Sequence, residues 1–291
     1  MIRFPLALTF VLASLFAAGC APAVYVPLKA EDSGTIRNTR VHAAIVQDEV
    51  AAAVERSNVA AAGGGGLLLA LVDVAVESHR TSRANKLMEP VRKEVGDFDF
   101  RAQFGATLQK TALELSALKV TQAATTAKPL VISDPAALWK DVPEDAVLAL
   151  VTNYELSANF RSLTMVTVAA LWTRNQKEPI YRGRYLYHTP PIGAFKELEE
   201  SSQAWAANNG AALRAAMTQG IAETMKMLTL DLGTAGGTPT ASPTPKLSIL
   251  ELSFPAYLAK DGNRYIVRID GGALTSASSD ERFTPDSMPS R

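Results

Sequence analysis

The residues whose types could do chemistry are few and widely spaced in this chain of 291 residues. It contains one cysteine, Cys20, and three histidines, His42, His79 and His188. None of the histidines begins an H-E-x-x-H pair, so their spacing predicts no metal site. No G-x-S-x-G, C-x-x-C or P-loop motif occurs, so we expect no catalytic residue, no bound cofactor and no enzyme. Cys20 alone has a position that indicates a chemical role.

Cys20 closes an N-terminal segment that has the features of a secretory signal. Arg3 supplies the positive charge at its start, and an uncharged, mostly apolar run extends from Phe4 to Ala18. A bilayer span needs about 20 such residues, and this run is shorter, as the apolar part of a signal peptide is. The sequence therefore predicts export across a membrane and removal of residues 1–19.

The hexapeptide that ends at Cys20, Leu-Phe-Ala-Ala-Gly-Cys, resembles the lipobox of bacterial lipoproteins, in which small residues precede an invariant cysteine. The usual aliphatic residue three positions before the cysteine is Ala17 here. The resemblance implies that Cys20 is acylated, so that it can be labelled with palmitate, and becomes the new N-terminus. Ala21 stands where the family has the aspartate that retains lipoproteins at the inner membrane. The resemblance therefore implies an outer-membrane lipoprotein that faces the periplasm.

A second cleavage site competes with this interpretation. Ala21, Pro22 and Ala23 form an A-x-A triplet, which the ordinary signal peptidase recognises. Cleavage there would discard Cys20 and release a protein without a lipid anchor. A-x-A triplets arise by chance in alanine-rich sequence, whereas a lone cysteine at the end of an apolar run is typical of a lipidation site. Lipidation of Cys20 is the favoured prediction.

The charge and the cysteine content agree with this predicted location. Removing Arg3 from the 29 basic residues leaves one fewer than the 29 acidic residues, a net charge of about −1. A balance so close to neutral gives no electrostatic reason to bind nucleic acid. Without a second cysteine, an internal disulfide is impossible, so the fold depends on its packed core.

The order of patterns along the chain predicts its domain organisation and an α+β fold. Three antiparallel strands, a meander, are expected between Ala146 and Tyr187, with helices packed on one face of the sheet. Asp261-Gly262-Asn263 is a hairpin signal that predicts a small C-terminal β-hairpin. The expected segments are a signal peptide at 1–19, a lipid-anchored tether at 20–40, an α+β domain at 41–232, a flexible linker at 233–246, the hairpin at 247–275 and a disordered tail at 276–291.

An unusual apolar helix, which opens on Gly63 to Gly66, is expected over 63–84 within that domain. Leucine, valine and alanine side chains of residues 67–76 form a wide apolar arc, and Asp73, Glu77 and Arg80 line up opposite. That polar strip and the length argue against a span in lipid, and no Gly-Lys-Ser/Thr follows the glycines, as a nucleotide-binding loop requires. The segment either packs against the domain or a partner subunit, or contacts the membrane within an oligomer.

Three further groups could be sites, and each has a simpler interpretation. Asp97-Phe98-Asp99 could hold a cation, but a helix break with an N-cap aspartate explains it. The β-strand pattern places Tyr181, Tyr185 and Tyr187 on one face, which indicates a half-buried sheet face more than a ligand surface. The methionines share helical spacing and are expected in the core. They are Met217, Met225 and Met227.

These observations predict a membrane-anchored cell-envelope lipoprotein with a non-catalytic structural, assembly or transport-auxiliary role. The order of elements is weakly similar to periplasmic modules of secretion and transport auxiliary lipoproteins. Expected partners are the membrane, through the lipid anchor, and an envelope protein or a second copy of the chain. The alternative is a carrier of lipid or another small molecule, in which the arc of 67–76 lines a cavity.

Overall fold

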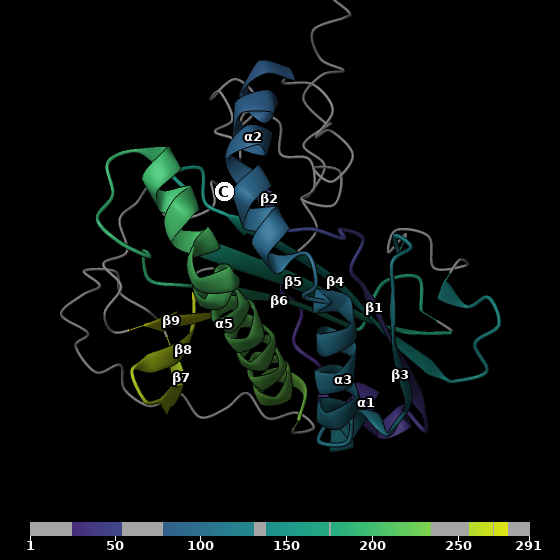
Figure 1. Ribbon diagram of the computed structural model, residues 1–291. Helices are drawn as coiled ribbons and strands as arrows, with labels where there is room; N and C mark the ends of the chain where they lie inside the picture. Colours follow the sequence, from purple (N-terminus) through teal and green to yellow (C-terminus); the bar gives the residue numbers. More distant parts are fainter. Residues whose placement is uncertain are drawn as a thin grey trace, which may run out of the picture.

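The structure is a computed structural model that describes residues 25–53, 78–130, 138–174, 176–233, 256–269 and 271–278. In these ranges a large mixed sheet is combined with four α-helices and a short 3-10 helix, η2, at Ser116–Leu118 (Figure 1). The helices are α1 (Ala30–Thr35), α2 (Ser78–Val95), α3 (Phe100–Ala112) and α5 (Leu198–Leu232). The chain is therefore a mixed α and β protein.

The sheet has nine strands in the order β3-β1-β4-β5-β6-β9-β8-β7, and β2 pairs with β4 beside this path. The strands are β1 (Thr39–Ala44), β2 (Ala51–Ala52), β3 (Val120–Thr126), β4 (Ala146–Leu156), β5 (Leu163–Thr173), β6 (Tyr181–His188), β7 (Ala256–Asp261), β8 (Arg264–Arg268) and β9 (Leu274–Ser278). The strands that are last in the sequence thus extend the sheet from β6.

The three central strands, β4, β5 and β6, are antiparallel neighbours, as the sequence predicts. The prediction of an antiparallel sheet is wrong elsewhere. β1 runs parallel to both β3 and β4, and β6 runs parallel to β9. Parallel neighbours need a long crossover, and α2 and α3 lie in the chain between β1 and β3. Such pairings join distant segments, and alternation within one strand does not reveal them.

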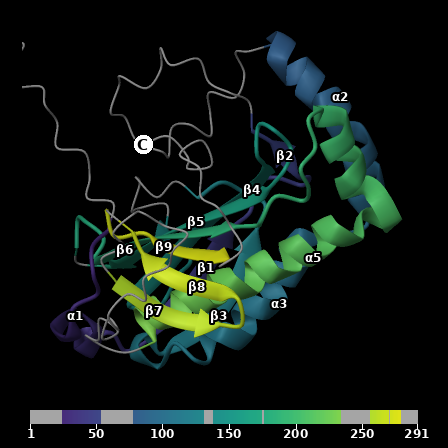
Figure 2. The same cartoon turned by 90° about the vertical axis from the view of Figure 1, so that its left-hand side faces the viewer.

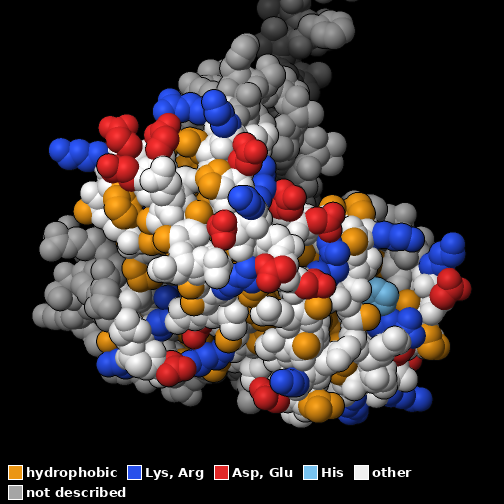
Figure 3. Space-filling model, in the orientation of Figure 1, with side chains coloured by type: hydrophobic (Ala, Val, Ile, Leu, Met, Phe, Trp, Pro, Cys, Tyr) orange, Lys and Arg blue, Asp and Glu red, His pale blue; other side chains and the backbone are white. Residues whose placement is uncertain are grey.

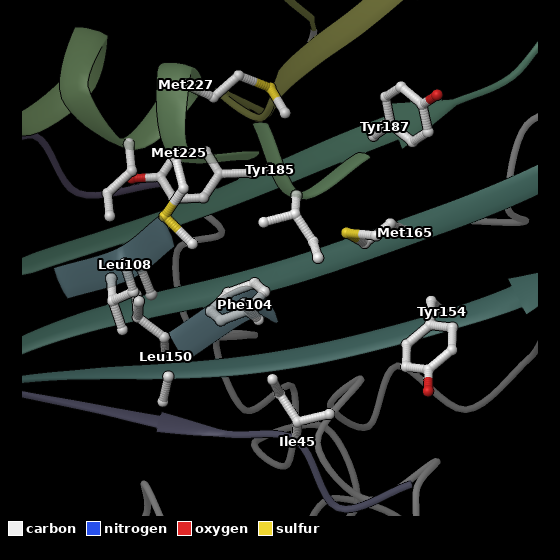
Figure 4. Packing of buried hydrophobic residues seen from close by; sticks show 14 of the residues in the cluster. Ile45, Phe104, Leu108, Leu150, Tyr154, Met165, Tyr185, Tyr187, Met225 and Met227 are labelled. Carbon is white, nitrogen blue, oxygen red and sulfur yellow. The ribbon is translucent and has the colours of Figure 1, made fainter. Parts of the chain in front are cut away.

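One face of the sheet carries the main core beneath the helices (Figure 2). Phe104 and Leu108 of α3 and Met225 of α5 lie close to Leu150 and Tyr185 of the sheet (Figure 4). The methionines predicted to lie in the core do so, with exposed fractions of at most 3%. On the opposite face a smaller cluster packs the strands against residues before β4. It contains Ala44, Leu138, Ala149, Val151, Ala170 and Trp172.

Residues 25–40 are folded into the domain, so the prediction of a tether over 20–40 is wrong for this part. Val26 pairs with Arg182 of β6 through hydrogen bonds of 2.9 and 3.0 Å. Leu28 and Ile36 are 8% and 1% exposed. These apolar side chains show no helical or strand periodicity in the sequence, but burying each one stabilises a fold by about 1.5–3 kcal/mol.

The C-terminal strands are more extensive than a hairpin. β7 and β8 are antiparallel and flank Gly262 and Asn263, the turn indicated by the sequence. β9 then pairs with β8 on one side and with β6 on the other. β9 continues to Ser278, and Ser276 is fully buried, so the prediction of disorder from residue 276 is wrong as far as 278. The side chains of β9 are held between two strands and against α5, which the local sequence does not reveal.

Several expectations lie outside the described residues. They are the signal peptide with Cys20, residues 63–77 of the Gly-led helix, the linker beyond Gly233 and the tail from 279. Residues 78–84 of that helix form the start of α2. Over the ranges that the structure describes, no helix is both long and apolar enough to cross a bilayer.

A sharp kink divides α5 at Asn208, Asn209 and Gly210. Asn208, Asn209 and Gly210 have φ angles of 52°, 57° and 66°, in the left-handed region that favours glycine. Gly210 also lies against α2, because a Cβ there would be 2.5 Å from Cγ1 of Val95. The absence of a side chain thus lets α2 pack closely on the kink.

We expect Gly210→Ala to destabilise the fold. The left-handed backbone costs alanine about 1–2 kcal/mol, and the collision with Val95 adds about 1–3 kcal/mol of overpacking. Gly262→Ala is the matched control, since Gly262 also has a positive φ, 57°, but has no atom within 4 Å of an added Cβ. Urea unfolding of both variants measures the difference. Equal losses of stability would show that α2 does not press on the kink.

Candidate functional site

A buried polar cluster joins the first described residue of the chain to its middle and to its C-terminal strands. Its members are Tyr25, Tyr181 and Tyr185 of β6, Asp231 near the end of α5 and Arg268 of β8. We call it the Asp231 junction. Burial of a carboxylate is costly unless donors surround it, so the contacts of Asp231 decide what this cluster does.

Asp231 accepts hydrogen bonds on both carboxylate oxygens. Oδ1 accepts from the Tyr25 hydroxyl at 3.2 Å and from Nη2 of Arg268 at 2.7 Å. Oδ2 accepts from the Tyr181 hydroxyl, and the Tyr185 hydroxyl lies 3.5 Å away and hydrogen-bonds to that of Tyr181. The side chain of Asp231 is 2% exposed and that of Arg268 is 12% exposed. The ion pair is therefore buried, and both carboxylate oxygens have donors, although Nε of Arg268 has no partner among the described residues. Breaking such a pair leaves a buried charge without compensation, which is strongly destabilising.

Two glycines make room for the tyrosines of the junction. Gly183 lies between Tyr181 and Tyr185, and a Cβ there would be 2.1 Å from the Tyr181 hydroxyl oxygen. Gly272 has a φ of +85°, and its Cβ would be 2.3 Å from Cβ of Tyr25. The turn before β9 therefore needs glycine both for its backbone and for close contact with Tyr25.

Arg268 and the tyrosines surround the carboxylate of Asp231 with donors. The guanidinium lies 4.3 Å from the centre of the Tyr25 ring and donates to the carbonyl oxygen of Gly272 at 2.7 Å. Burial raises the pKa of Tyr25 to about 12, and it raises the pKa values of Tyr181 and Tyr185 well above 10. The three hydroxyls therefore stay protonated. Those of Tyr25 and Tyr181 donate to the carboxylate, and that of Tyr185 donates to the Tyr181 hydroxyl. This arrangement can hold chain segments together.

A second polar cluster fixes the same strands further along β6. The Ser276 hydroxyl donates to Oε2 of Glu223 on α5 at 2.5 Å and accepts from Nε of Arg264 at 3.0 Å. Nη2 of Arg264 donates to the carbonyl oxygens of Ser276 and His188 at 2.7 and 2.9 Å. The Arg264 guanidinium lies 4.6 Å from the centre of the Tyr187 ring. The two clusters together attach β8 and β9 to α5 and β6.

The structure gives different roles to the candidate site residues that the sequence indicated. Tyr181, Tyr185 and Tyr187 do share a face, but they are fully buried beneath the helices, so they form no surface for a ligand. Asp99 caps α3 by accepting from the amide of Ala102, as predicted. Asp97 forms an ion pair with Arg214. Within the described ranges no group of three or more His, Cys, Asp or Glu residues is placed to hold a metal ion.

The charged residues of these clusters have only weak signals in the sequence. Asp231 and Glu223 lie within an apolar helix, and an acid on such a helix is the signal that could have identified them. Arg264 and Arg268 lie in a short strand whose pattern shows alternation only. Their acidic or hydroxyl partners are distant along the chain, so spacing alone cannot pair them.

Comparison with known proteins gives little more. No protein-family model matches the chain, and no curated protein matches it. Among solved structures, it is similar to the crystal structure of protein XCC0632 from Xanthomonas campestris, assigned to the family model DUF330, with 10% sequence identity and a TM-score of 0.25. The match covers 70% of this chain and 89% of that one. A likeness of this size assigns neither a family nor a function.

We expect Asp231→Asn to destabilise the protein by about 3–5 kcal/mol, because the variant leaves Arg268 buried beside a neutral amide. Asp261→Asn is the matched control, since Asp261 pairs with Lys226 at 2.8 Å but its side chain is 70% exposed. Exposed pairs contribute little, so the control should unfold at nearly the wild-type urea concentration. Similar unfolding midpoints for the two variants would contradict the importance of the junction.

His188 should make stability depend on pH. Burial, with a smaller effect of Arg264, lowers its pKa from 6.5 to about 4. Between these values the unfolded chain binds a proton that the folded chain does not, so stability falls as pH falls from 6.5 to 4, by at most ~3 kcal/mol. The wild type should lose more stability than His188→Gln over this range in urea unfolding. Parallel losses would show that His188 is not buried as a neutral imidazole.

Proposed function

We propose that the chain is a bacterial lipoprotein, acylated at Cys20 and held at the outer membrane facing the periplasm. In this proposal it is a non-catalytic structural or assembly component of the envelope, or an auxiliary subunit of a transport complex. Its partner is another envelope protein or a second copy of the chain. Stable anchoring follows from several acyl chains, at about 0.8 kcal/mol for each buried CH₂ group.

The observation that carries the proposal is the position of Tyr25. It is fixed in the Asp231 junction only five positions after Cys20. The fold thus begins almost where the predicted signal ends, as expected of a domain that is held close to its anchor. The contacts of Tyr25 among the described residues, with Asp231, Tyr181 and Arg268, would also survive removal of residues 1–19.

The buried charged groups support a role in structure. Arg268 of β8 donates to Asp231 of α5 inside the fold. Ser276 of β9 donates to Glu223 of α5 and accepts from Arg264 of β8, which also donates to the carbonyl oxygen of His188. We infer that the C-terminal hairpin, extended by β9, docks on the α+β domain through these contacts. On the face shown in Figure 3, basic, acidic and apolar side chains are interspersed, and such a mixture gives no electrostatic reason to bind nucleic acid.

The anchor is tested by labelling cells with radioactive palmitate and separating their membranes. We expect the wild type to carry the label and to sediment with the outer membrane. Cys20→Ala should lose the label and be released into the periplasm by cleavage after Ala23. The proposal fails if the wild type is unlabelled or if Cys20→Ala is labelled equally well.

The role in an assembly is tested by crosslinking in intact cells, followed by mass spectrometry and purification in mild detergent. A stable large assembly with an envelope protein, or with further copies of the chain, is the expected result. A monomer that purifies with bound lipid would instead favour the carrier alternative. That alternative depends on residues 67–76, which lie outside the described ranges.

A further inference from the structure

We propose that the domain meets the bilayer with one particular end, the end that carries α1, η2, the β5–β6 turn and the last turn of α5. We call this the basal end. The proposal rests on acylation of Cys20 and adds to it the orientation of the domain. In this orientation α2 and the first part of α5 point away from the membrane, toward the space where a partner can bind.

The first step is the short reach of the chain between the anchor and the fold. Five Cα–Cα steps separate Cys20 from Tyr25. A fully extended chain covers at most about 3.6 Å for each step, so Tyr25 lies within about 18 Å of the anchored residue. A domain of this size has a radius of gyration of about 18 Å, so such a tether is too short to let the domain turn over.

The second step is that Tyr25 cannot easily leave its place. Its hydroxyl donates to Asp231, its ring lies edge-on to Tyr181 at 6.5 Å between centroids, and Arg268 lies over its face. The next residue, Val26, forms two backbone hydrogen bonds with Arg182. Pulling residues 25–28 out of the fold would leave the carboxylate of Asp231 with fewer donors, at a cost that buried charge makes large.

The third step is the location of Tyr25 within the fold. Tyr181 pairs with Leu171 near the end of β5, and the sheet continues from there to the first residues of β4 and β1, Ala146 and Thr39. The Ser116 hydroxyl of η2 donates to the carbonyl oxygen of Gly233, which follows α5. These segments form one end of the molecule, and α2 extends beyond the opposite end (Figures 1 and 2).

The opposite end is far from the anchor. β6 runs from Tyr181 to His188, which is about 23 Å at 3.3 Å per residue. Beyond it, Arg161 hydrogen-bonds to Ile192 and Gly193 of the segment that leads to α5. A side chain at Lys196 therefore lies more than the length of β6 from the basal end.

The basal end has side chains that a membrane surface tolerates. Leu113, after α3, is 84% exposed and lies three residues before Ser116 of η2. Charged side chains of both signs occur nearby, and two pairs are Lys29 with Glu31 and Arg182 with Glu178. A balanced surface is not repelled by anionic headgroups, and an exposed leucine can insert at the headgroup boundary.

The test is energy transfer from a fluorophore on the intact lipoprotein to rhodamine-labelled lipid in vesicles of phosphatidylethanolamine and phosphatidylglycerol. Acylation consumes the thiol of Cys20, so Lys177→Cys and Lys196→Cys each provide one reactive thiol. Both positions are exposed, the first at the basal end and the second at the opposite end. The Cys20–Tyr25 segment reaches at most about 18 Å, and β6 adds about 23 Å to the distance of the opposite end from the bilayer. Energy transfer from position 177 should therefore be at least about twice that from position 196.

The control is a flexible insertion after Ala23. A roughly 24-residue Gly-Ser segment has a root-mean-square length of about 27 Å and should abolish the difference between the two positions. Equal transfer from both positions without the insertion, or greater transfer from position 196, would overturn the orientation while leaving the anchor intact. A mature protein whose mass shows no acyl chains would overturn the proposed function together with the orientation.

Discussion

The buried carboxylate of Asp231 connects three parts of the chain that are far apart in sequence. It holds Tyr25 from the N-terminal segment, Tyr181 and Tyr185 from the central sheet, and Arg268 from the C-terminal strands. A buried acid is unfavourable by itself, so the cluster is stable only when all these segments are present. The ends of the folded chain therefore depend on each other, and neither is an appendage of the central domain.

This dependence has a consequence for any partner that binds the protein. Arg264 and Ser276 attach the last strands to Glu223 of α5, about two helical turns before Asp231, so both clusters act on one helix. A force or a binding event at the C-terminal strands is thus applied directly to α5 and, through Asp231, to the segment that follows Cys20. Glu223 and Asp231 both lie on the part of α5 that follows the kink.

Local patterns predict the elements of this fold better than they predict how the elements meet. Alternation from Leu148 to Leu156 indicates β4, and the run of Asn208, Asn209 and Gly210 indicates the kink in α5, because both depend on neighbouring residues only. The pairing of β6 with β9 crosses the whole of α5, and no short pattern contains it. The sequence predicts a tether over residues 20–40 because Pro22, Pro27, Gly34 and scattered charges there follow no periodicity.

The candidate site is hidden from sequence for the same reason. Strand alternation places Tyr181 and Tyr185 on one face, but their acid, Asp231, lies 46 residues beyond Tyr185, and Tyr25 lies 206 residues before that acid. Cys20 can be identified as a candidate lipidation site from sequence because the resemblance to a lipobox depends only on the six residues that end with it. A site assembled from distant segments becomes visible only in the folded structure.

Hydrogen exchange at the amide of Val26 tests the central claim most directly, because that amide donates to the carbonyl oxygen of Arg182 in the sheet and lies next to Tyr25, which Asp231 holds. If the N-terminal segment belongs to the fold, this amide should exchange as slowly as those of β6. Exchange as fast as in an unstructured peptide, with β6 still protected, would show that Tyr25 and Val26 are not held in the fold and would contradict the account.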